Sequence, residues 1–143
     1  MITLLLSVAA VLLFALIIHF VPKKTGIEVA TLTDSITAKW ADAQTPMNKG
    51  MRLVTGSTGY LLREGIVQIE FDNQARVTIE SPAEFEILTG DQVKLNYGRL
   101  YATVPQGAIG FAVQTPSARI IDLGTEFGID ASTLGDTNLH VMK

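Results

Sequence analysis

The sequence predicts an all-β domain preceded by one membrane-spanning helix. Between Lys23 and Lys143 there are 12 glycines and 4 prolines, roughly one turn signal for every 7 or 8 residues, so few intervals can hold an ordinary helix. Within these intervals apolar residues alternate with polar ones, which is the period of a strand with one buried face. All charged residues follow Pro22, and the stretch before it is almost wholly apolar.

The N-terminal run from Ile2 to Val21 is the candidate helix. Three of its twenty residues are polar, and as a helix it would be about 30 Å long, the thickness of the hydrocarbon core of a bilayer. A cleaved signal peptide is the alternative, but the run exceeds a usual hydrophobic region, no basic residue precedes it and no Ala-x-Ala site follows. We therefore expect a transmembrane helix at residues 2–22, a short linker at 23–28 and a β domain at 29–143.

Charge leaves the orientation of this helix open. Lys23 and Lys24 follow the apolar run, and the positive-inside rule alone would place the β domain in the cytoplasm. The last residues, LHVMK, stop within an apparent strand with no turn after them. We therefore expect the given chain to be a segment of a longer one at both ends, in which upstream charges can reverse this orientation.

Composition excludes several kinds of function. The formal net charge is −3, and the part after Pro22 has no basic stripe for nucleic acid. No cysteine is present, so there is no disulfide framework, thiolate metal site or cysteine nucleophile. No glycine-rich phosphate motif occurs. We expect neither a cofactor nor a nucleic-acid partner.

Segments of period two follow one another along the β domain. The first is the second half of residues 27–45, and residues 66–71 and 76–80 then flank a turn at Asp72, Asn73 and Gln74, which favours a hairpin. Further strands are expected in AEFEIL, QVKLNYG, RLYATVP, GFAVQTP, SARIIDL and TEFGID, and a last one at residues 139–142.

About nine or ten strands of roughly 4–7 residues predict a β-sandwich or a short solenoid. No amphipathic helix is available to cover the apolar faces, so these faces must cover one another. Pro82, Pro105 and Pro116 each follow an expected strand and are expected to end it, because proline has no N–H to donate to a ladder. Four aromatic residues are expected in the core: Phe71, Phe85, Phe111 and Phe127.

The stretch TPSARIIDLGTEFGID, residues 115–130, holds the carboxylates that could carry chemistry. Asp122 and Glu126 flank a Gly-Thr turn. An aspartic protease needs Asp followed at once by Thr or Ser and then Gly, in two copies, and neither condition is met here. A weak cation site between the two carboxylates is conceivable, but no histidine lies near them. No serine nucleophile with a histidine partner can be assembled.

Fold geometry accounts for the same stretch more simply. Gly124 would take a backbone angle that other residues avoid, Thr125 would bond back to the main chain, and Phe127 would enter the core. Asp122 and Glu126 are then expected at the surface. We therefore expect a protein without enzymatic activity, because a glycosidase or protease would need one of these carboxylates in a cleft.

Read as TP-x-A-R-x-x-D-L-GTEFGI, this stretch resembles the signature segment of the FecR family, the membrane-anchored regulators that work with bacterial extracytoplasmic-function sigma factors. The residues that carry the resemblance are Thr115, Pro116, Asp122, Gly124, Thr125, Glu126 and Phe127. The segments ATLTDSITAKWAD, GMRLVTG, LLREGIVQIEFDNQARVTIESPAEFEIL and GRLYATVPQGAIGFAVQTP agree in order, so the resemblance runs from about residue 29 to residue 141.

The resemblance implies a periplasmic, β-rich domain anchored in the inner membrane by one span. Such a domain receives a signal outside the membrane and passes it to a cytoplasmic anti-sigma region. In the founding iron-uptake systems the partner is a TonB-dependent receptor of the outer membrane. The sigma-factor contact and the receptor contact of the family lie in further regions, which we expect outside the given residues.

We therefore expect a module that works by contact with protein partners outside the inner membrane. Its expected docking edge is the final strand at Leu139, His140 and Val141, because an exposed sheet edge can accept a partner strand.

The alternative function is a membrane-anchored β-sandwich that binds carbohydrate or cell-wall material. Trp40, Tyr60 and Tyr101 are too few and too scattered in the sequence to favour this reading.

Overall fold

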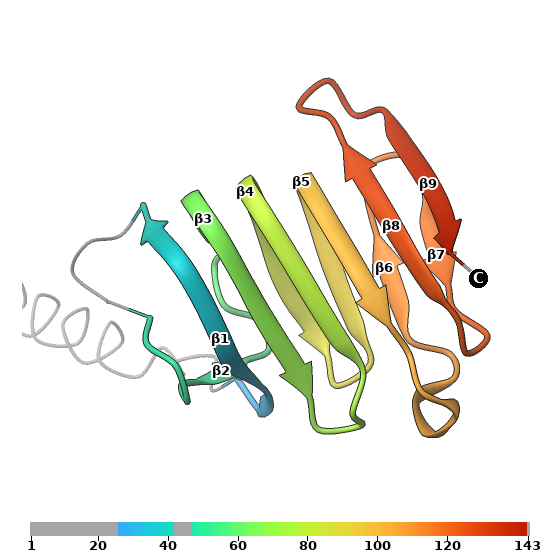
Figure 1. Cartoon of the computed structure of the whole chain (residues 1–143), viewed down its shortest axis with the longest axis horizontal. Coiled ribbons are helices and arrows are strands. Elements are labelled where there is room, and N and C mark those ends of the chain that lie inside the picture. The colour runs from blue at the N-terminus through green and yellow to red at the C-terminus, as the bar shows by residue number, and fades with distance from the viewer. Residues whose placement is uncertain (1–25, 42–46, 143) are drawn as a thin grey trace, which may run out of the picture.

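The computed structural model describes residues 26–41 and 47–142, which form one nine-stranded sheet (Figure 1). The strands are β1 (Glu28–Trp40), β2 (Arg52–Val54), β3 (Tyr60–Phe71), β4 (Arg76–Thr89), β5 (Gln92–Thr103), β6 (Ala112–Gln114), β7 (Arg119–Ile121), β8 (Glu126–Ala131) and β9 (Thr137–Met142), with one 3-10 turn, η1 (Gln106–Ala108). The prediction of an all-β domain is confirmed. The transmembrane helix predicted at residues 2–22 lies outside the described residues. Within the described part of the chain, no helix is long and apolar enough to cross a membrane.

The sheet is an antiparallel meander that divides at β5. Its order is β2-β1-β3-β4-β5-β6-β7, and β8 pairs with both β5 and β9. Residues 92–94 of β5 pair with β6 in parallel, whereas residues 98–103 pair with β8 in antiparallel fashion. The β6–β7 hairpin and the β8–β9 hairpin therefore extend the sheet along two separate branches.

The four longest strands, β1, β3, β4 and β5, contain 13, 12, 14 and 12 residues. The prediction of uniformly short strands was wrong here, because the two breaks expected near Pro82 and Gly98 are bends within continuous strands. Pro82 lies inside β4, where the register against β5 shifts between Glu80 and Glu84, so it does not end a strand. A proline is tolerated at such an irregularity because no ladder bond is lost there. Pro105 and Pro116 do follow strands, as predicted.

The bends form a line across the sheet, which we call the bend line: Thr37, Gly65, Pro82 and Gly98. At this line the buried positions change phase, from Leu62 to Val67 in β3 and from Leu95 to Leu100 in β5. Side chains alternate along a strand, so the odd step in β3 and β5 lets both halves turn their apolar residues inward, whereas β4 keeps its phase across Pro82. The bend line thus allows both halves of one long strand to contribute apolar side chains to the core.

Neighbouring backbones approach closely at the bend line. Gly65 and Gly98 have φ angles of 91° and 119°. A Cβ on Gly98 would lie 2.5 Å from the Cβ of Ala83, and one on Gly65 would lie 2.4 Å from the carbonyl oxygen of Ile36. Both positions require glycine, for space and for backbone conformation.

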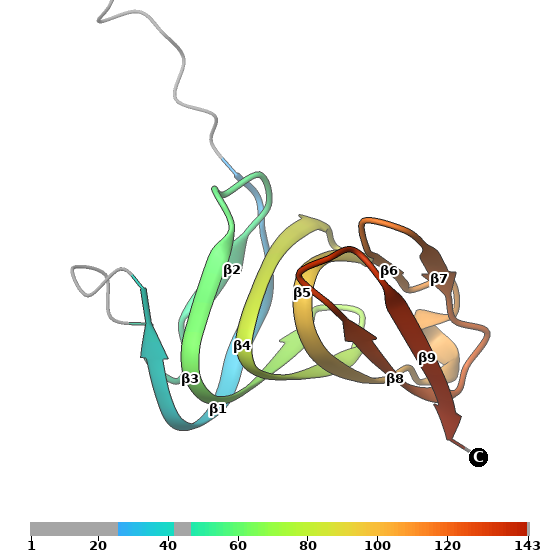
Figure 2. The same cartoon turned by 90° about the horizontal axis from the view of Figure 1, so that it is seen from above.

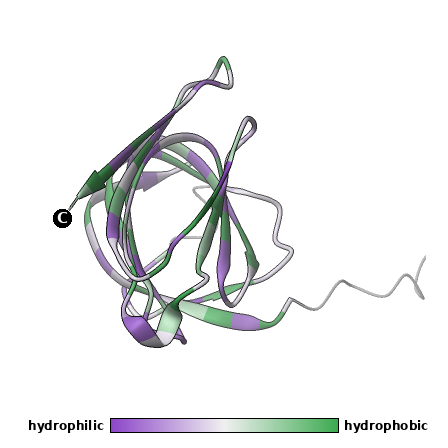
Figure 3. Cartoon of the chain, turned by 90° about the vertical axis from the view of Figure 1, so that its right-hand side faces the viewer, coloured by the Kyte–Doolittle hydropathy of each residue, from purple (hydrophilic) through white to green (hydrophobic). Residues whose placement is uncertain are grey.

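Bending at this line folds the sheet over, so that its two halves face each other around a common interior (Figures 2 and 3). The described strands belong to one open sheet, not to the two separate sheets of a sandwich, and consecutive long strands are antiparallel hairpins rather than the stacked coils of a solenoid. The four predicted core aromatics are all buried, and Phe71 packs edge-on against Phe111 with ring centroids 4.8 Å apart. The hairpin predicted around residues 72–74 is also present. Ile36 is 59% exposed, since it lies beside the bend line rather than over the core.

We predict that Gly98→Ala destabilises the domain by about 2 kcal/mol or more, since it adds a strained backbone angle and an overlap with Ala83. Gly107→Ala is the matched control, because a Cβ there meets nothing within 4 Å. Denaturant unfolding of the two variants measures the difference. Equal stabilities would show that the close approach at Gly98 is not required.

Candidate functional site

The first turn of the motif ties together the two hairpins that end the sheet. Thr115 is 4% exposed, and its hydroxyl donates to the carbonyl of Ala118 at 3.3 Å and accepts from the amide of Ala118 at 3.0 Å. The Oγ1 of Thr137 lies 2.7 Å from the Oγ1 of Thr115 and 2.8 Å from the Oγ of Ser117. Because Thr137 begins β9, this hydroxyl chain holds β9 against the turn before β7. Pro116 is exposed within that turn.

The second turn is built on Asp122, which is 2% exposed. The prediction that Asp122 lies at the surface was wrong. Its Oδ1 accepts hydrogen bonds from the amides of Gly124 and Thr125 and from the hydroxyl of Thr125, each at 2.8 Å. The prediction that the Thr125 hydroxyl bonds to the main chain was wrong, because this hydroxyl donates to the side chain of Asp122. Gly124 has a φ of 98°, Phe127 is buried and Glu126 is exposed, as predicted.

The backbone of Asp122 joins this turn to the loop after β5. Its amide donates to the carbonyl of Phe111, and its carbonyl accepts from the amide of Gly110, both at 2.9 Å. The Oδ2 atom of Asp122 is buried and has no hydrogen-bond partner among the described residues. Over those residues, no three His, Asp or Glu side chains gather as metal ligands would. The role of Asp122 that these contacts support is to fix the turn.

The candidate docking residues Leu139, His140 and Val141 lie in β9, as predicted. Over residues 26–41 and 47–142, β9 pairs with β8 alone, so its other edge is free. Leu139 and Val141 stand opposite Ile129 and Phe127, and directly opposed residues share a face of the sheet. Ile129 and Phe127 are 1% and 2% exposed, whereas Leu139 and Val141 are 47% and 65% exposed. At β9 the inner face of the sheet is therefore exposed, because no described residue covers Leu139 and Val141.

The ladder shows which main-chain groups of β9 are free. At the hairpin turn the amide of Ser132 donates to the carbonyl of Asp136, and at the other side of β8 the amide of Val104 donates to the carbonyl of Thr125. Hydrogen-bonded pairs alternate along antiparallel strands, so β8 uses its even-numbered residues toward the even-numbered residues of β9. The N–H and C=O groups of Leu139 and Val141 consequently point away from β8.

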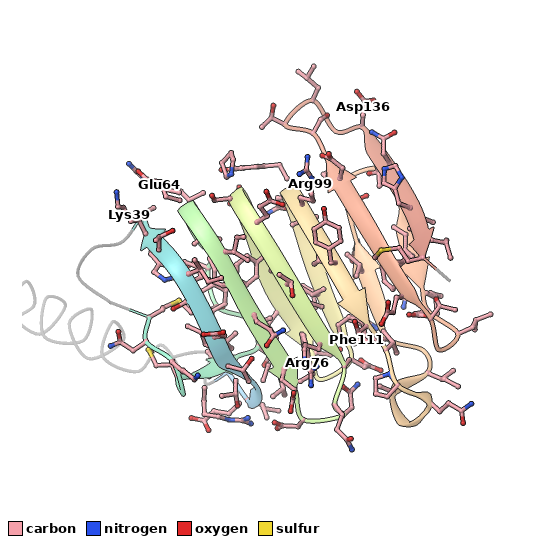
Figure 4. All side chains as sticks on the ribbon, viewed as in Figure 1. Lys39, Glu64, Arg76, Arg99, Phe111 and Asp136 are labelled. Carbon is pink, nitrogen blue, oxygen red and sulfur yellow. The ribbon has the colours of Figure 1, made fainter. Side chains whose placement is uncertain are left out.

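A small pocket lies on the outer face of the same hairpin. Gly128 has no side chain, and a Cβ there would lie 3.1 Å from the ring of Tyr101 and 4.0 Å from the Cβ of His140. These residues line a pocket of about 270 Å³. Beside it Arg99, labelled in Figure 4, lies 3.4 Å from both Glu80 and Asp130. The hydrogen bond to Asp130, and then the charge of Glu80, raise the pKa of Arg99, so this guanidinium is committed to neighbouring carboxylates.

Thr137 is the site residue that sequence reasoning missed. It lies 22 positions from Thr115 and 20 from Ser117. Nothing in the local sequence around a hydroxyl residue indicates a hydrogen-bond partner that is so far away along the chain. The alternation of Leu139 and Val141 was visible, but their exposure depends on which strand, if any, lies beside β9.

We predict that Asp122→Ala lowers the free energy of unfolding by about 1–3 kcal/mol, because three donors lose a buried acceptor. Water can reach exposed Gly124 and Thr125, which keeps the loss below three full hydrogen bonds. Asp122→Asn keeps one acceptor oxygen and is expected to lose less. A catalytic role would be indicated instead if Asp122→Asn matched the wild type in unfolding yet abolished an activity of the protein.

Comparison with known proteins yields one relationship. A family model described as FecR protein matches residues 51–143, which is more than half of the chain and includes both turns of the motif and the docking edge. Searches of curated proteins and of solved structures found no match. On the strength of this match and of the motif's place in the fold, the chain belongs to the FecR family.

Proposed function

We propose that this chain is a membrane-anchored sensor and regulatory module that relays a signal to sigma-factor control by protein–protein contact. The β domain stands outside the inner membrane, and the apolar run at residues 2–22 is its single anchor. Membership of the FecR family is the observation that carries the proposal. The role needs no chemistry, and we propose that the module is not an enzyme.

The junction between the β domain and the preceding segment is held to the sheet by an ion-pair network and by two hydrogen bonds. Arg52 binds both carboxylate oxygens of Asp72 at 2.6 Å and lies 3.6 Å from Glu28, at the start of β1. The amide of Ile27 donates to the Thr55 hydroxyl, and the amide of Thr55 donates to the carbonyl of Ile27. Because the chain is held from Ile27 onward, a movement of the sheet moves its N-terminal end as well.

This ion pair has a defined pH dependence. The hydrogen bond from Arg52 holds the pKa of Asp72 below its ordinary value. A carboxylate with a lowered pKa stabilises the folded state above its ordinary pKa, and this contribution disappears as the pH falls through the lowered value. The pair is solvent-exposed, so its contribution is small, and the junction keeps its form at neutral pH.

The docking edge lies far from this junction in the sheet. β1 and β2 form one end of the strand order, and β9 ends the branch that leaves β5 (Figure 1). A partner bound at β9 can change the state of the module only through a difference in affinity between two states. The arrangement suits a relay, because the input edge and the output junction belong to one continuous hydrogen-bonded sheet.

The two alternative functions find less support. Trp40 and Tyr60 pack with Phe85, with ring centroids 5.2–6.5 Å apart, so they contribute to the interior rather than to a sugar-binding platform. For an enzyme, the carboxyl of Asp122 is buried on its own turn and Glu126 is exposed. Neither observation favours a binding cleft.

The location can be tested with single cysteines, because the chain has none of its own. Leu134, in the turn between β8 and β9, is 90% exposed, so Leu134→Cys should react with a membrane-impermeant maleimide in intact spheroplasts. Ala102→Cys is the control, since Ala102 is 1% exposed and should react after denaturation alone. Labelling of Leu134→Cys that requires lysis of the spheroplasts would place the domain in the cytoplasm.

The regulatory role can be tested in the native cell by deleting residues 51–142 and sequencing the transcripts. We expect altered expression of a set of genes that share one sigma-factor promoter type. Val141→Pro should reproduce the effect, because it removes an N–H that faces the free edge and leaves the β8 ladder intact. Val141→Thr keeps that N–H and serves as the control. If the deletion alters no set of genes with a shared promoter type, the proposed regulatory role is wrong. If the deletion alters such a set and Val141→Pro does not, the assignment of the docking edge to β9 is wrong.

A further inference from the structure

We propose that a hollow on the outer face of the sheet, beside the bend line, binds a neutral saccharide through Glu80, Arg99 and Asp130. The hollow measures about 390 Å³, which is at the lower end of the range of about 300–1,000 Å³ for small-molecule sites. The inference goes beyond the proposed function, because it gives the module a small ligand of stated chemistry in addition to a protein partner.

The bend line produces this hollow. Pro82 and Gly98, two residues of the bend line, both line it. Glycine has no side chain to fill the space, and irregularities of a strand are over-represented next to active sites because they re-aim side chains. The rest of the lining comes from β4, β5, β8 and the turn after β8, and among the described residues none of β9 contributes to it. The hollow therefore does not depend on the edge at β9.

Three charged side chains form a cross-strand row at the hollow. Arg99 of β5, labelled in Figure 4, stands opposite Glu80 of β4 and opposite Asp130 of β8, so all three share one face of the sheet. The Nη1 of Arg99 lies 3.4 Å from the Oε2 of Glu80, and its Nη2 lies 3.4 Å from the Oδ2 of Asp130. The row therefore presents an acceptor, a donor and an acceptor in a fixed order.

The row keeps hydrogen-bonding capacity for a ligand. Its two internal contacts use two of the five N–H groups of a guanidinium, and each engages one oxygen of its carboxylate. At 3.4 Å they are also longer than the about 2.7–2.9 Å of a strong charge-assisted hydrogen bond. The three side chains are between 39% and 48% exposed, so a ligand can reach them from solvent.

The order of charges in the row disfavours an ionic ligand. An anion would meet two carboxylates, and a cation would meet the guanidinium that lies between them. A neutral ligand with adjacent hydroxyls meets neither penalty, because a hydroxyl can donate to a carboxylate and accept from Arg99. The row therefore fits a polyhydroxylated, uncharged molecule.

The remaining lining residues narrow this class to a saccharide. Ser81 and Thr133 add hydroxyl groups at the hollow, and Tyr97 and Pro82 add an aromatic and an aliphatic ring. A buried or half-buried tyrosine offers an apolar ring together with a polar tip. A sugar has hydroxyls along its edge and an apolar C–H face, so both kinds of lining residue find a partner on it.

An array of neutral glycans tests the ligand class. It is probed with the labelled full chain in a detergent that has no sugar headgroup. We expect binding to a subset of the glycans, and titration with the soluble oligosaccharide of the strongest one gives its Kd. Arg99→Ala should raise this Kd about tenfold, because the variant loses the only donor of the row.

Arg76→Ala is the matched control for Arg99→Ala. Arg76 is 50% exposed and forms a similar ion pair with Glu70, and Glu70 and Glu80 are both 39% exposed. Arg76 does not line this hollow, so the Kd of its variant should equal that of the wild type. Glu80→Gln keeps the size of its side chain, and it provides a second measurement if Arg99→Ala changes the unfolding curve.

Three results would overturn the proposal. The first is an array on which no glycan binds the chain. The second is a Kd that Arg99→Ala and Glu80→Gln both leave unchanged, because the glycan would then bind elsewhere. The third is binding of spermidine or citrate, but of no glycan, that Arg99→Ala alters, because the ligand would then be an ion. None of these results bears on the transcript experiment, which tests the regulatory role separately.

Discussion

The close approach of neighbouring strands at the bend line is the constraint on which the rest of the structure depends. Gly98 lies against Ala83 and Gly65 lies against the backbone of Ile36 and Thr37 at distances that leave no room for a side chain. Because the strands bend there without ending, one sheet supplies both layers of the domain. The buried positions change phase at the same line in β3 and β5, so sequence alternation and bend support each other. A domain of this size can then enclose a core without a covering helix.

The division of β5 follows from the same bend. Its first residues pair with β6 and its last residues with β8, and the sheet therefore ends in two hairpins rather than one. Among the described residues, β7 and β9 each pair on one side only, and the family motif lies between them. Asp122 fixes the turn that leads into β8, and the hydroxyls of Thr115, Ser117 and Thr137 join that region to the start of β9. The signature residues thus help to position the last strand.

The proposed role in protein contact needs a surface that is both available and firmly placed, and β9 has both properties among the described residues. Its backbone is held on one side by β8 and at its start by Thr137, while no described strand pairs with its other side. At the opposite end of the sheet, Arg52 and Thr55 hold the first residues of the domain. Under the proposed function, one continuous hydrogen-bonded sheet would connect the edge at β9 with this junction.

The sequence by itself determined the all-β class, the hairpin around Asp72–Gln74, the aromatic core and the family. Each of these depends on local alternation, on turn residues or on a contiguous motif. Tertiary structure alone decided that Pro82 lies within a strand, because the neighbouring strands keep the chain in the ladder on both sides of it. It also decided that Asp122 is buried, because the loop around Gly110 and Phe111 covers it, and that Leu139 and Val141 are exposed. The local sequence around such residues is the same whether or not another segment packs over them. Whether a segment does so is decided by the folded sheet, and their burial therefore could not be predicted from the sequence.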